Sequence, residues 1–201
     1  MTLAIDEAFL PATWTARPMT DEEFFEFRAE YPDLHFEMTA EGELIAMAPT
    51  HCETGARSAE VLGDLRNWTK KRRNGRCFDS STGFVLPNGA RRSPDASWVS
   101  KARLLPKAES DSFWHLCTDF VIQVRSGSDR LGLLQRKMRE YLEQGAKLGW
   151  LIDAEKRTVT IYRPEGDVET RTGINQLKGE GPVASFSMDL TEIWDPRAHL
   201  D

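Results

Sequence analysis

Four polar side chains interrupt the apolar segments in the middle of the sequence, at positions where they could bind a cation or transfer protons. Asp95 follows Pro94 and opens the apolar run ASWV, and Gln123 lies inside the segment DFVIQVR. Arg125 comes two residues after Gln123, so the two side chains share a face if this segment is a strand. Lys137 belongs to the next segment, which has helical periodicity. Because a buried polar group costs free energy unless it is paired, we predict that these residues form a functional site.

The elements that would position these residues are helices and strands in alternation. DFVIQVR is a nearly continuous apolar run, which is typical of a strand at the centre of a buried sheet. Thr20 and Glu23 form a capping-box pattern at the start of a short helix. The expected helices are 20–30, 55–71 and 129–144, and the expected strands are 35–38, 42–47, 84–86, 95–99, 119–125, 148–153 and 159–162.

These elements predict a mixed α/β (α+β) fold in which a central mixed β-sheet is flanked by helices. The segment after residue 170 is expected to form edge strands and a terminal turn near Ile193. No linker or repeat divides the chain, so 1–201 is predicted to be a single domain, with 1–18 as an N-terminal arm packed on it. The centre of the sheet is expected to consist of the strands at 84–86, 95–99, 119–125 and 148–153.

The overall composition excludes several classes of protein. The chain has 201 residues, of which 40% are hydrophobic, and this is enough for a core of its own. Its net charge of −6 excludes a basic coat such as that of a histone-like protein, but not a local basic groove. No apolar run approaches the roughly 20 residues of a membrane span, and the N-terminus lacks the basic region of a signal peptide, so we expect a cytoplasmic protein. The three widely spaced cysteines predict neither a disulfide framework nor a zinc site.

Five segments between residues 36 and 194 carry a resemblance to a known family. They read FEMTAEGELIAMAPT, RRSPDASWV, DFVIQVRSGSD, KMREYLEQGAKLGWLID and VTIYRP, in this order. In these segments the chain resembles the bacterial Uma family, within the PD-(D/E)xK superfamily of restriction-endonuclease-like nucleases. The resemblance implies a restriction-endonuclease-like core and the hydrolysis of phosphodiester bonds.

The resemblance also assigns roles to individual residues. Asp95 matches the P-D motif and would be the first metal-binding carboxylate. Gln123 stands where the family has its second acid, and Arg125 stands at the lysine position of the (D/E)-x-K motif. The family commonly moves that lysine to the next helix, ahead of a tyrosine, and this matches Lys137 and Tyr141 in KMREY.

Two upstream acids complete the set that the resemblance implies. Glu53, in PTHCETG, matches a position that carries Glu or His in relatives, and Glu37 matches a Glu before the first hairpin. The implied catalytic residues are Asp95, Gln123, Lys137 and Glu53, and the implied Mg²⁺ ligands are Asp95, Gln123 and Glu53, with Mn²⁺ as a substitute. Metal ions held by carboxylates can activate a water molecule and stabilise negative charge. A lysine near the phosphate can orient that water or offset the charge.

Gln123 departs from the family's pattern, because a carboxamide has the shape of a carboxylate but no charge. Its carbonyl oxygen can still bind a cation weakly, but the site loses one negative charge and with it much of its affinity for Mg²⁺. Three explanations stay open at this point. The chain is a naturally degenerate relative, Glu37 or Glu53 supplies the missing charge, or the glutamine is an introduced replacement of a glutamate.

Basic residues close to Asp95 suggest where nucleic acid would bind. Arg91 and Arg92, together with Arg125 and Ser126, are predicted to contact phosphates. A structural ion pair is the alternative for Arg125, and a cap for the next helix, formed with Ser128 and Asp129, is the alternative for Ser126. A second basic cluster is equally consistent with a solvated helix end, and it comprises Arg66, Lys70, Lys71, Arg72, Arg73 and Arg76.

We therefore predict a metal-dependent DNA endonuclease, in particular a Mg²⁺-dependent endodeoxyribonuclease whose activity is impaired by Gln123. Its partner would be DNA, and a homodimer would provide one site for each strand of a duplex. The alternative is a catalytically inactive module that keeps the nuclease fold and binds nucleic acid or regulates another protein. The sequence leaves the preferred DNA sequence, and the choice between DNA and RNA, open.

Overall fold

The computed structural model describes residues 10, 12–47, 51–104 and 113–198. Part of the predicted N-terminal arm, 1–9 and 11, lies outside the described residues. The remainder of that arm contains a strand, β1 (Ala12–Thr15), which pairs with β3 (Glu43–Met47).

A six-stranded sheet forms the centre of the molecule, in the order β12-β11-β10-β9-β7-β4. The pair β9–β10 is parallel and the other neighbours are antiparallel, so the prediction of a central mixed sheet is confirmed. The strands are β4 (Gly75–Asp79), β7 (Ala96–Ser100), β9 (Phe120–Val124), β10 (Leu148–Asp153), β11 (Thr158–Tyr162) and β12 (Val168–Thr172). The edge strand β4 was not predicted, because its sequence GRCFD lacks the apolar alternation of a half-buried strand.

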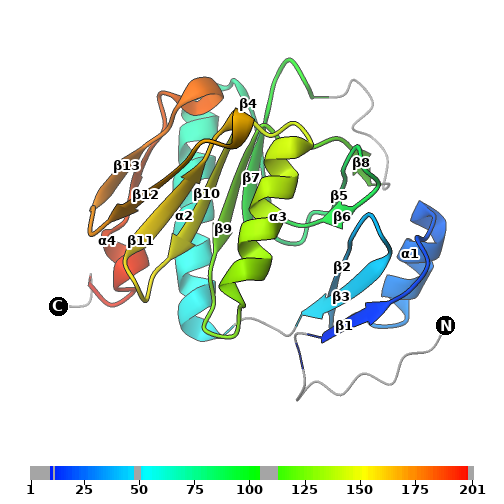
Figure 1. Cartoon of the computed structure of the whole chain (residues 1–201). Helices are drawn as coiled ribbons and strands as arrows, with labels where there is room; N and C mark the ends of the chain where they lie inside the picture. Colours follow the sequence, from blue (N-terminus) through cyan, green and yellow to red (C-terminus); the bar gives the residue numbers. More distant parts are fainter. Residues whose placement is uncertain (1–9, 11, 48–50, 105–112, 199–201) are drawn as a thin grey trace.

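One long helix covers each face of the central sheet (Figure 1). Helix α2 (Cys52–Arg72) begins before the predicted start at residue 55, and its C-cap, Arg73, is left-handed with φ 52°. Helix α3 (Leu131–Glu143) packs on the other face. It ends at Glu143 with Gln144 as its C-cap, and Gly145 follows with a positive φ of +113°, as is common for a glycine just after a helix.

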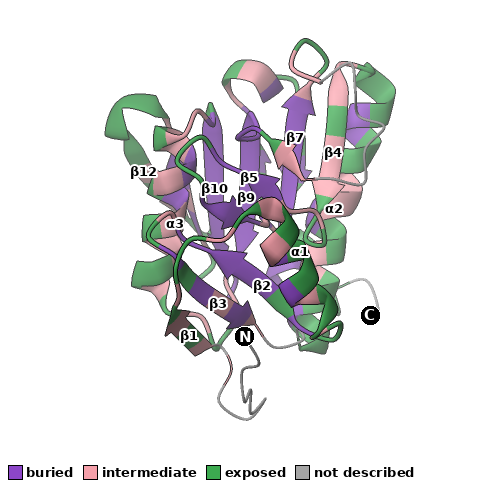
Figure 2. Ribbon diagram, turned by 90° about the vertical axis from the view of Figure 1, so that its right-hand side faces the viewer, coloured by how far each residue is buried: buried purple, intermediate pink, exposed green. Residues whose placement is uncertain are grey.

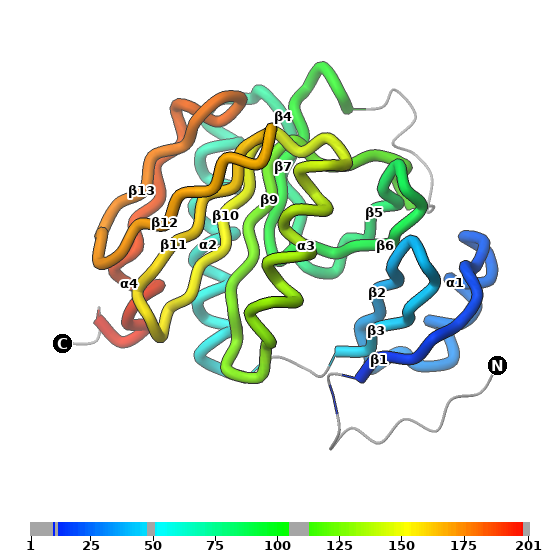
Figure 3. The backbone as a smooth tube through the Cα atoms, in the orientation of Figure 1, coloured from blue at the N-terminus to red at the C-terminus, as the bar shows by residue number. Residues whose placement is uncertain are grey.

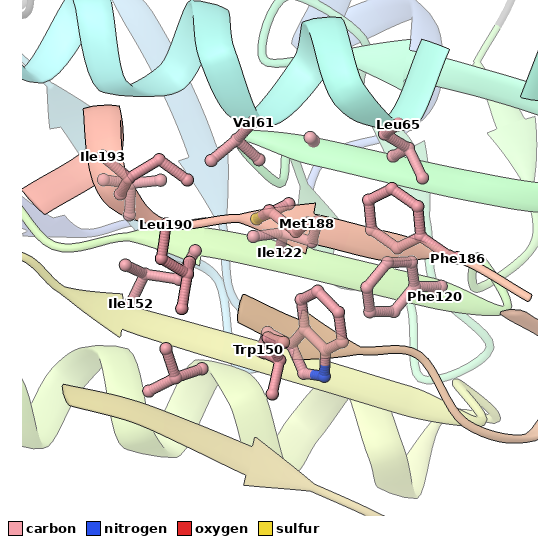
Figure 4. Packing of buried hydrophobic residues seen from close by; sticks show 14 of the residues in the cluster. Val61, Leu65, Phe120, Ile122, Trp150, Ile152, Phe186, Met188, Leu190 and Ile193 are labelled. Carbon is pink, nitrogen blue, oxygen red and sulfur yellow. The ribbon is translucent and has the colours of Figure 1, made fainter. Parts of the chain in front are cut away.

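The apolar residues of β9 alternate between the two faces of the sheet. Phe120, Ile122 and Val124 belong to the cluster that packs against α2, whereas Val121 belongs to the cluster that packs against α3. Gln123 has the same parity as Val121 and is therefore on the α3 face. Figure 4 shows the packing between α2 and the sheet, and Figure 2 shows that β7, β9 and β10 are buried along their length.

A second six-stranded sheet carries the N-terminal part of the chain, in the order β1-β3-β2-β6-β5-β8. Its other strands are β2 (His35–Met38), β5 (Phe84–Val85), β6 (Arg91–Arg92) and β8 (Trp114–His115), and helix α1 (Asp21–Ala29) packs on it. The prediction that 84–86 lies at the centre of the main sheet is therefore wrong. The strand is where it was expected, but its pairing partners are β6 and β8, and a two-residue strand gives no periodicity that identifies them.

The C-terminal segment returns to the α2 face. It contains β13 (Gln176–Lys178), β14 (Ser187–Asp189), α4 (Thr191–Trp194) and the short 3-10 helix η3 (Gly181–Val183). Another 3-10 helix, η2 (Pro164–Gly166), joins β11 to β12 and lies against α3. Figure 3 shows that the C-terminal segment, in orange and red, lies on the side of the molecule away from the N-terminal sheet. None of the helices in the described ranges combines the length and apolar character needed to cross a membrane.

Candidate active site

Asp95 and Gln123 face each other across two neighbouring strands. The register of β7 and β9 pairs Ala96 with Ile122, so its continuation by one residue puts Asp95 opposite Gln123. Asp95 also has the parity of Val99, which packs against α3, so both polar side chains are on the α3 face. The backbone N–H of Val124 donates a hydrogen bond to Oδ2 of Asp95, with an N–O distance of 2.6 Å. This bond fixes the carboxylate at the end of β9.

The surroundings of Asp95 favour its protonated form. Burial raises the pKa of this carboxyl group to about 6, although the ammonium of Lys137 and the bond from Val124 act in the opposite direction. The negative charges of Asp129 and Glu37 raise the pKa further. An acid with a raised pKa among other ionisable groups is typical of a functional site, because such a carboxylate gains from the approach of a cation.

Gln123 is almost fully buried, with 6% of its surface exposed. Within the described part of the chain its Oε1 accepts no hydrogen bond. A buried polar atom without a partner in a folded protein calls for an explanation, such as a water molecule or an ion. The side chain expected at the second acid position therefore presents an unsatisfied oxygen on the same face as Asp95.

Lys137 approaches this face from α3 and is held by a buried network. Its Nζ lies 2.7 Å from Oε1 of Glu37 and 3.2 Å from the carbonyl oxygen of Ser93. Burial alone would raise the pKa of Glu37, but the positive charges of Lys137 and Arg92 outweigh it, so the pKa is lower than usual. Arg92 in turn donates from Nε to Oε2 of Glu140 at 2.7 Å. Glu37 therefore positions the Lys137 ammonium close to Asp95.

Both oxygens of Glu37 are already occupied. Oε1 accepts hydrogen bonds from Lys137 and from the backbone N–H of Ser93 at 2.8 Å, and Oε2 accepts one from Arg92 at 3.3 Å. A role for Glu37 as a direct cation ligand would require at least one of these bonds to break. Tyr141, one turn beyond Lys137, is fully buried, and the Nζ of Lys137 lies 5.9 Å from the centre of its ring.

The predicted phosphate-binding arginines all make internal ion pairs. Arg91 donates to Oδ1 of Asp21 at 2.7 Å, and Arg92 pairs with Glu140 and Glu37. Arg125, on the α3 face beyond Gln123, donates to Oδ2 of Asp153 at 2.6 Å. The alternative of a structural ion pair therefore describes Arg125 as it stands in the fold.

Hydrogen bonds to its own side chains stabilise the loop between β9 and α3. Ser126 donates from its backbone N–H and from its hydroxyl to Oδ2 of Asp129, at 2.8 Å in each case. The alternative prediction that this segment caps the next helix is wrong, because the N-cap of α3 is Arg130 and no side chain caps it. The serine and aspartate bond to each other instead.

Glu53 lies away from these residues. It is in the first turn of α2, which covers the opposite face of the sheet, and it is exposed. Its carboxylate pairs with Arg57 at 3.3 Å and with Arg197 at 3.2 Å. The structure therefore brings Asp95, Gln123, Lys137 and Glu37 together, and it leaves Glu53 outside this group.

The residues present suit a hard divalent cation only in part. Mg²⁺ prefers oxygen ligands and is held by one or two carboxylates while it keeps several water molecules. Asp95 and the unsatisfied oxygen of Gln123 provide such ligands on one face. Among the residues that the structure describes, no group of three or more His, Cys, Asp or Glu side chains could hold a metal ion. These oxygen ligands are thus of the type that Mg²⁺ prefers, but only Asp95 carries a negative charge.

Sequence reasoning missed the hydrogen bonds between Asp129 and Ser126 and the buried link from Arg92 to Glu140. The segment SGSD follows the central strand directly, and a loop in that position lies at the same end of the sheet as the site. This placement was the available signal for Asp129. No local pattern identifies Glu140, whose partners Arg92 and Asn88 are far away in the sequence.

Comparisons with known proteins give a family and a fold. Residues 21–192 match the model of the Uma2 family, described as "Putative restriction endonuclease". A solved structure of a putative nuclease belonging to DUF820 from Anabaena variabilis has a similar fold, with a TM-score of 0.73 and 18% sequence identity. The match covers 88% of this chain and 98% of that one. No curated protein matches the chain.

Proposed function

Since the chain belongs to the Uma2 family of putative restriction endonucleases, we propose that it is a metal-dependent DNA endonuclease with reduced activity. The observation that carries this proposal is the convergence of Asp95, Gln123 and Lys137 on the α3 face of the sheet. The similar fold of a putative nuclease supports a restriction-endonuclease-like core.

In this proposal each residue has a distinct task. Asp95 and the oxygen of Gln123 would hold Mg²⁺, which would supply Lewis acidity to the scissile phosphate and lower the pKa of a bound water molecule. Lys137, fixed by its 2.7 Å contact with Glu37, would keep a positive charge beside the phosphate and offset the negative charge of the transition state. The uncharged Gln123 would weaken metal binding and thereby the activity.

Contact with the DNA backbone is proposed for the loop after β9. Ser126 and Ser128 are joined by a 3.0 Å hydrogen bond between their hydroxyls, at the start of α3. Serine hydroxyls and the first N–H groups of a helix are common phosphate contacts. Arg125 is the proposed cation here, since 18% of its side chain is exposed despite its pairing with Asp153. Arg92 would act by holding the N-terminal sheet against α3 through Glu140, and Arg91 by holding α1 on that sheet through Asp21.

A homodimer remains part of the proposal, because cleavage of both strands of a duplex is simplest with two sites. Light scattering on the purified chain is the measurement, and a mass twice that of the monomer is the expected result. A monomer that still produces double-strand breaks would contradict this part of the proposal alone.

The experiment for the activity compares this chain with its Gln123→Glu variant. Supercoiled and single-stranded DNA are incubated with each protein in Mg²⁺, in Mn²⁺ and in EDTA. We expect faster cleavage by Gln123→Glu than by the unchanged chain, no cleavage in EDTA, and no cleavage by Gln123→Glu/Asp95→Ala. Failure of both chains to cut any substrate would overturn the proposed activity.

A second function is favoured by one specific observation, the uncharged Gln123. A nucleic-acid-binding or regulatory module would keep the fold without the chemistry. In the same experiment it would bind DNA equally with metal and in EDTA, and Gln123→Glu would not restore cleavage.

A further inference from the structure

Positive charge is concentrated where α2 ends and β4 begins, although the chain as a whole has a net charge of −6. Residues 65–78 include no Asp or Glu. The end of β7 lies beside this segment, because the backbone N–H of Lys101 donates to the carbonyl oxygen of Asn74 at 2.7 Å. We call the exposed cations of this region the basic surface, and they are Arg66, Lys70, Lys71, Arg72, Arg73, Arg76 and Lys101.

The cations of the basic surface have no acidic partners. In the part of the chain that the structure describes, none of them pairs with a carboxylate, whereas Arg91, Arg92 and Arg125 near the candidate site all do. Neighbouring positive charges repel one another, and this repulsion is relieved when negative charge comes close. The basic surface therefore favours a ligand with several negative charges.

The dipole of α2 explains only part of this concentration. Cations are favourable in the last turn of a helix, and this accounts for residues 70–72. It does not account for Arg76, which is in β4, or for Lys101, which follows β7. Arg73 also has a left-handed backbone with φ 52°, which is uncommon for any residue except glycine.

The basic surface and the candidate active site lie at opposite ends of the central sheet. Asp95 precedes β7 and Lys101 follows it, and six residues of extended chain span about 20 Å. Figure 1 shows α2 ending at the top of the sheet, beside β4, and the loop between β9 and α3 at the bottom. A phosphate group bound at Asp95 is thus too far away to contact the basic surface.

We propose that the basic surface binds the phosphate backbone of DNA at a distance from the candidate active site and without preference for base sequence. Lysine and arginine side chains that neutralise phosphates release bound counterions, which favours binding and makes it sensitive to salt. Such contacts position a protein on DNA but carry no sequence information. This inference deepens the proposed function and takes DNA as the ligand from it. It assigns affinity for DNA to one end of the sheet and cleavage to the other.

The test measures DNA binding in EDTA, where no metal-dependent cleavage occurs. Fluorescence anisotropy with two labelled duplexes of unrelated sequence is recorded over a series of salt concentrations. For Lys70→Gln/Arg76→Gln we expect the slope of log K against log salt to fall by about 2, and binding to weaken roughly 10- to 50-fold at physiological salt. Both duplexes should show the same loss.

Arg139→Gln/Lys178→Gln is the matched control. It also removes one arginine and one lysine that are exposed and have no carboxylate partner in the described ranges, but these residues are on α3 and β13. We expect it to bind DNA as the unchanged chain does. An equal loss in the control would show that only net charge matters and would refute the basic surface.

Arg73→Gly separates DNA binding from stability. Glycine adopts the left-handed backbone at this position without steric cost, so we expect the melting temperature to stay the same or to rise. The lost charge should nevertheless lower the salt slope by about 1. Circular dichroism checks that every variant is folded.

The outcomes distinguish this inference from the proposed activity. If Lys70→Gln/Arg76→Gln binds DNA as the unchanged chain does while Gln123→Glu cleaves it, the basic surface is refuted and the activity stands. If the double variant loses binding and Gln123→Glu does not cleave, the basic surface stands and the activity falls. Absence of DNA binding by the unchanged chain at low salt would also refute the basic surface.

Discussion

Asp95 experiences opposing influences that set its protonation. Burial and the charges of Asp129 and Glu37 favour the neutral carboxyl group, whereas Lys137 and the N–H of Val124 favour the carboxylate. The balance raises the pKa to about 6, so the group is poised between the two forms close to neutral pH. A divalent cation would displace the proton and convert a destabilising charge into a ligand.

The raised pKa predicts a pH dependence of stability. Between the ordinary aspartate pKa, near 4, and about 6, the folded state binds more protons at Asp95 than the unfolded state does, so the contribution of this group to stability falls as pH rises through this window. The Asp95→Asn variant serves as the reference, because its amide side chain does not ionise in this pH range. Urea unfolding without metal, from pH 4 to 7, should show that the unchanged chain loses stability relative to Asp95→Asn. A constant difference between the two chains would refute the raised pKa.

Glu37 illustrates how a buried acid can serve structure and chemistry together. Its side chain is 3% exposed and pairs with Lys137 and Arg92, which are themselves largely buried. Removal of one member of a buried ion pair typically costs about 3–5 kcal/mol, because the partner charges stay buried without compensation.

We therefore predict that Glu37→Gln lowers the free energy of unfolding by about 3 kcal/mol. The measurement is equilibrium unfolding in urea. The double variant Glu37→Gln/Lys137→Met should recover part of the loss, since it removes one of the uncompensated charges. A single variant as stable as the unchanged chain would show that the network contributes little.

At the scale of elements, the site depends on how closely β4, β7 and β9 pack. Gly75 begins β4 opposite Ser100, and a Cβ atom there would lie 2.3 Å from the carbonyl oxygen of Val99 and 2.5 Å from the Trp98 ring. The backbone oxygen cannot move aside without distortion of β7, the strand that follows Asp95. Glycine is thus required at this position by packing.

Two glycine-to-alanine changes test this packing. Gly75→Ala is predicted to destabilise the protein by about 1–3 kcal/mol through overpacking. Gly63→Ala, in the middle of α2 with no atom within 4 Å of the new Cβ, should stabilise it by about 0.5–1 kcal/mol. Thermal unfolding of both variants is the measurement, and a tolerated Gly75→Ala would mean that β4 can shift away from β7.

The elements also show which parts of the fold can be read from the sequence. The apolar runs of β9 and β10 and the amphipathic pattern of α3 were predicted, because burial imposes a periodicity on them. The pairing of β5 with β6 and β8 was not predicted, since the register between short strands depends on residues that are distant in the sequence. The same reason applies to Arg91 and Arg92, whose charge was visible but whose partners, Asp21 and Glu140, come from other segments.

At the scale of the whole molecule, the two six-stranded sheets differ in how they are buried. The central sheet is covered on both faces by α2 and α3, and two of the three apolar clusters found among the described residues pack on it. The N-terminal sheet has a smaller cluster around Phe24 and Phe36, and charged contacts such as Glu37–Lys137 join it to α3.

This difference predicts a gradient in hydrogen exchange. Backbone amides of β9 and β10 should exchange slowest, close to the rate set by global unfolding, and those of β1 and α1 should exchange through local opening with a lower free energy. Native-state hydrogen exchange followed by mass spectrometry measures this order. Equal protection of β1 and β9 would mean that both sheets unfold as one unit.

The central claim is that Asp95 and Gln123 form one cation site, and diffraction from crystals soaked in Mn²⁺ tests it most directly. We predict an anomalous peak within about 2–2.5 Å of an oxygen of Asp95 and close to Oε1 of Gln123, as expected for a hard divalent cation. Crystals of Asp95→Ala should lose this peak. Full Mn²⁺ occupancy elsewhere, with no density between Asp95 and Gln123, would contradict the account.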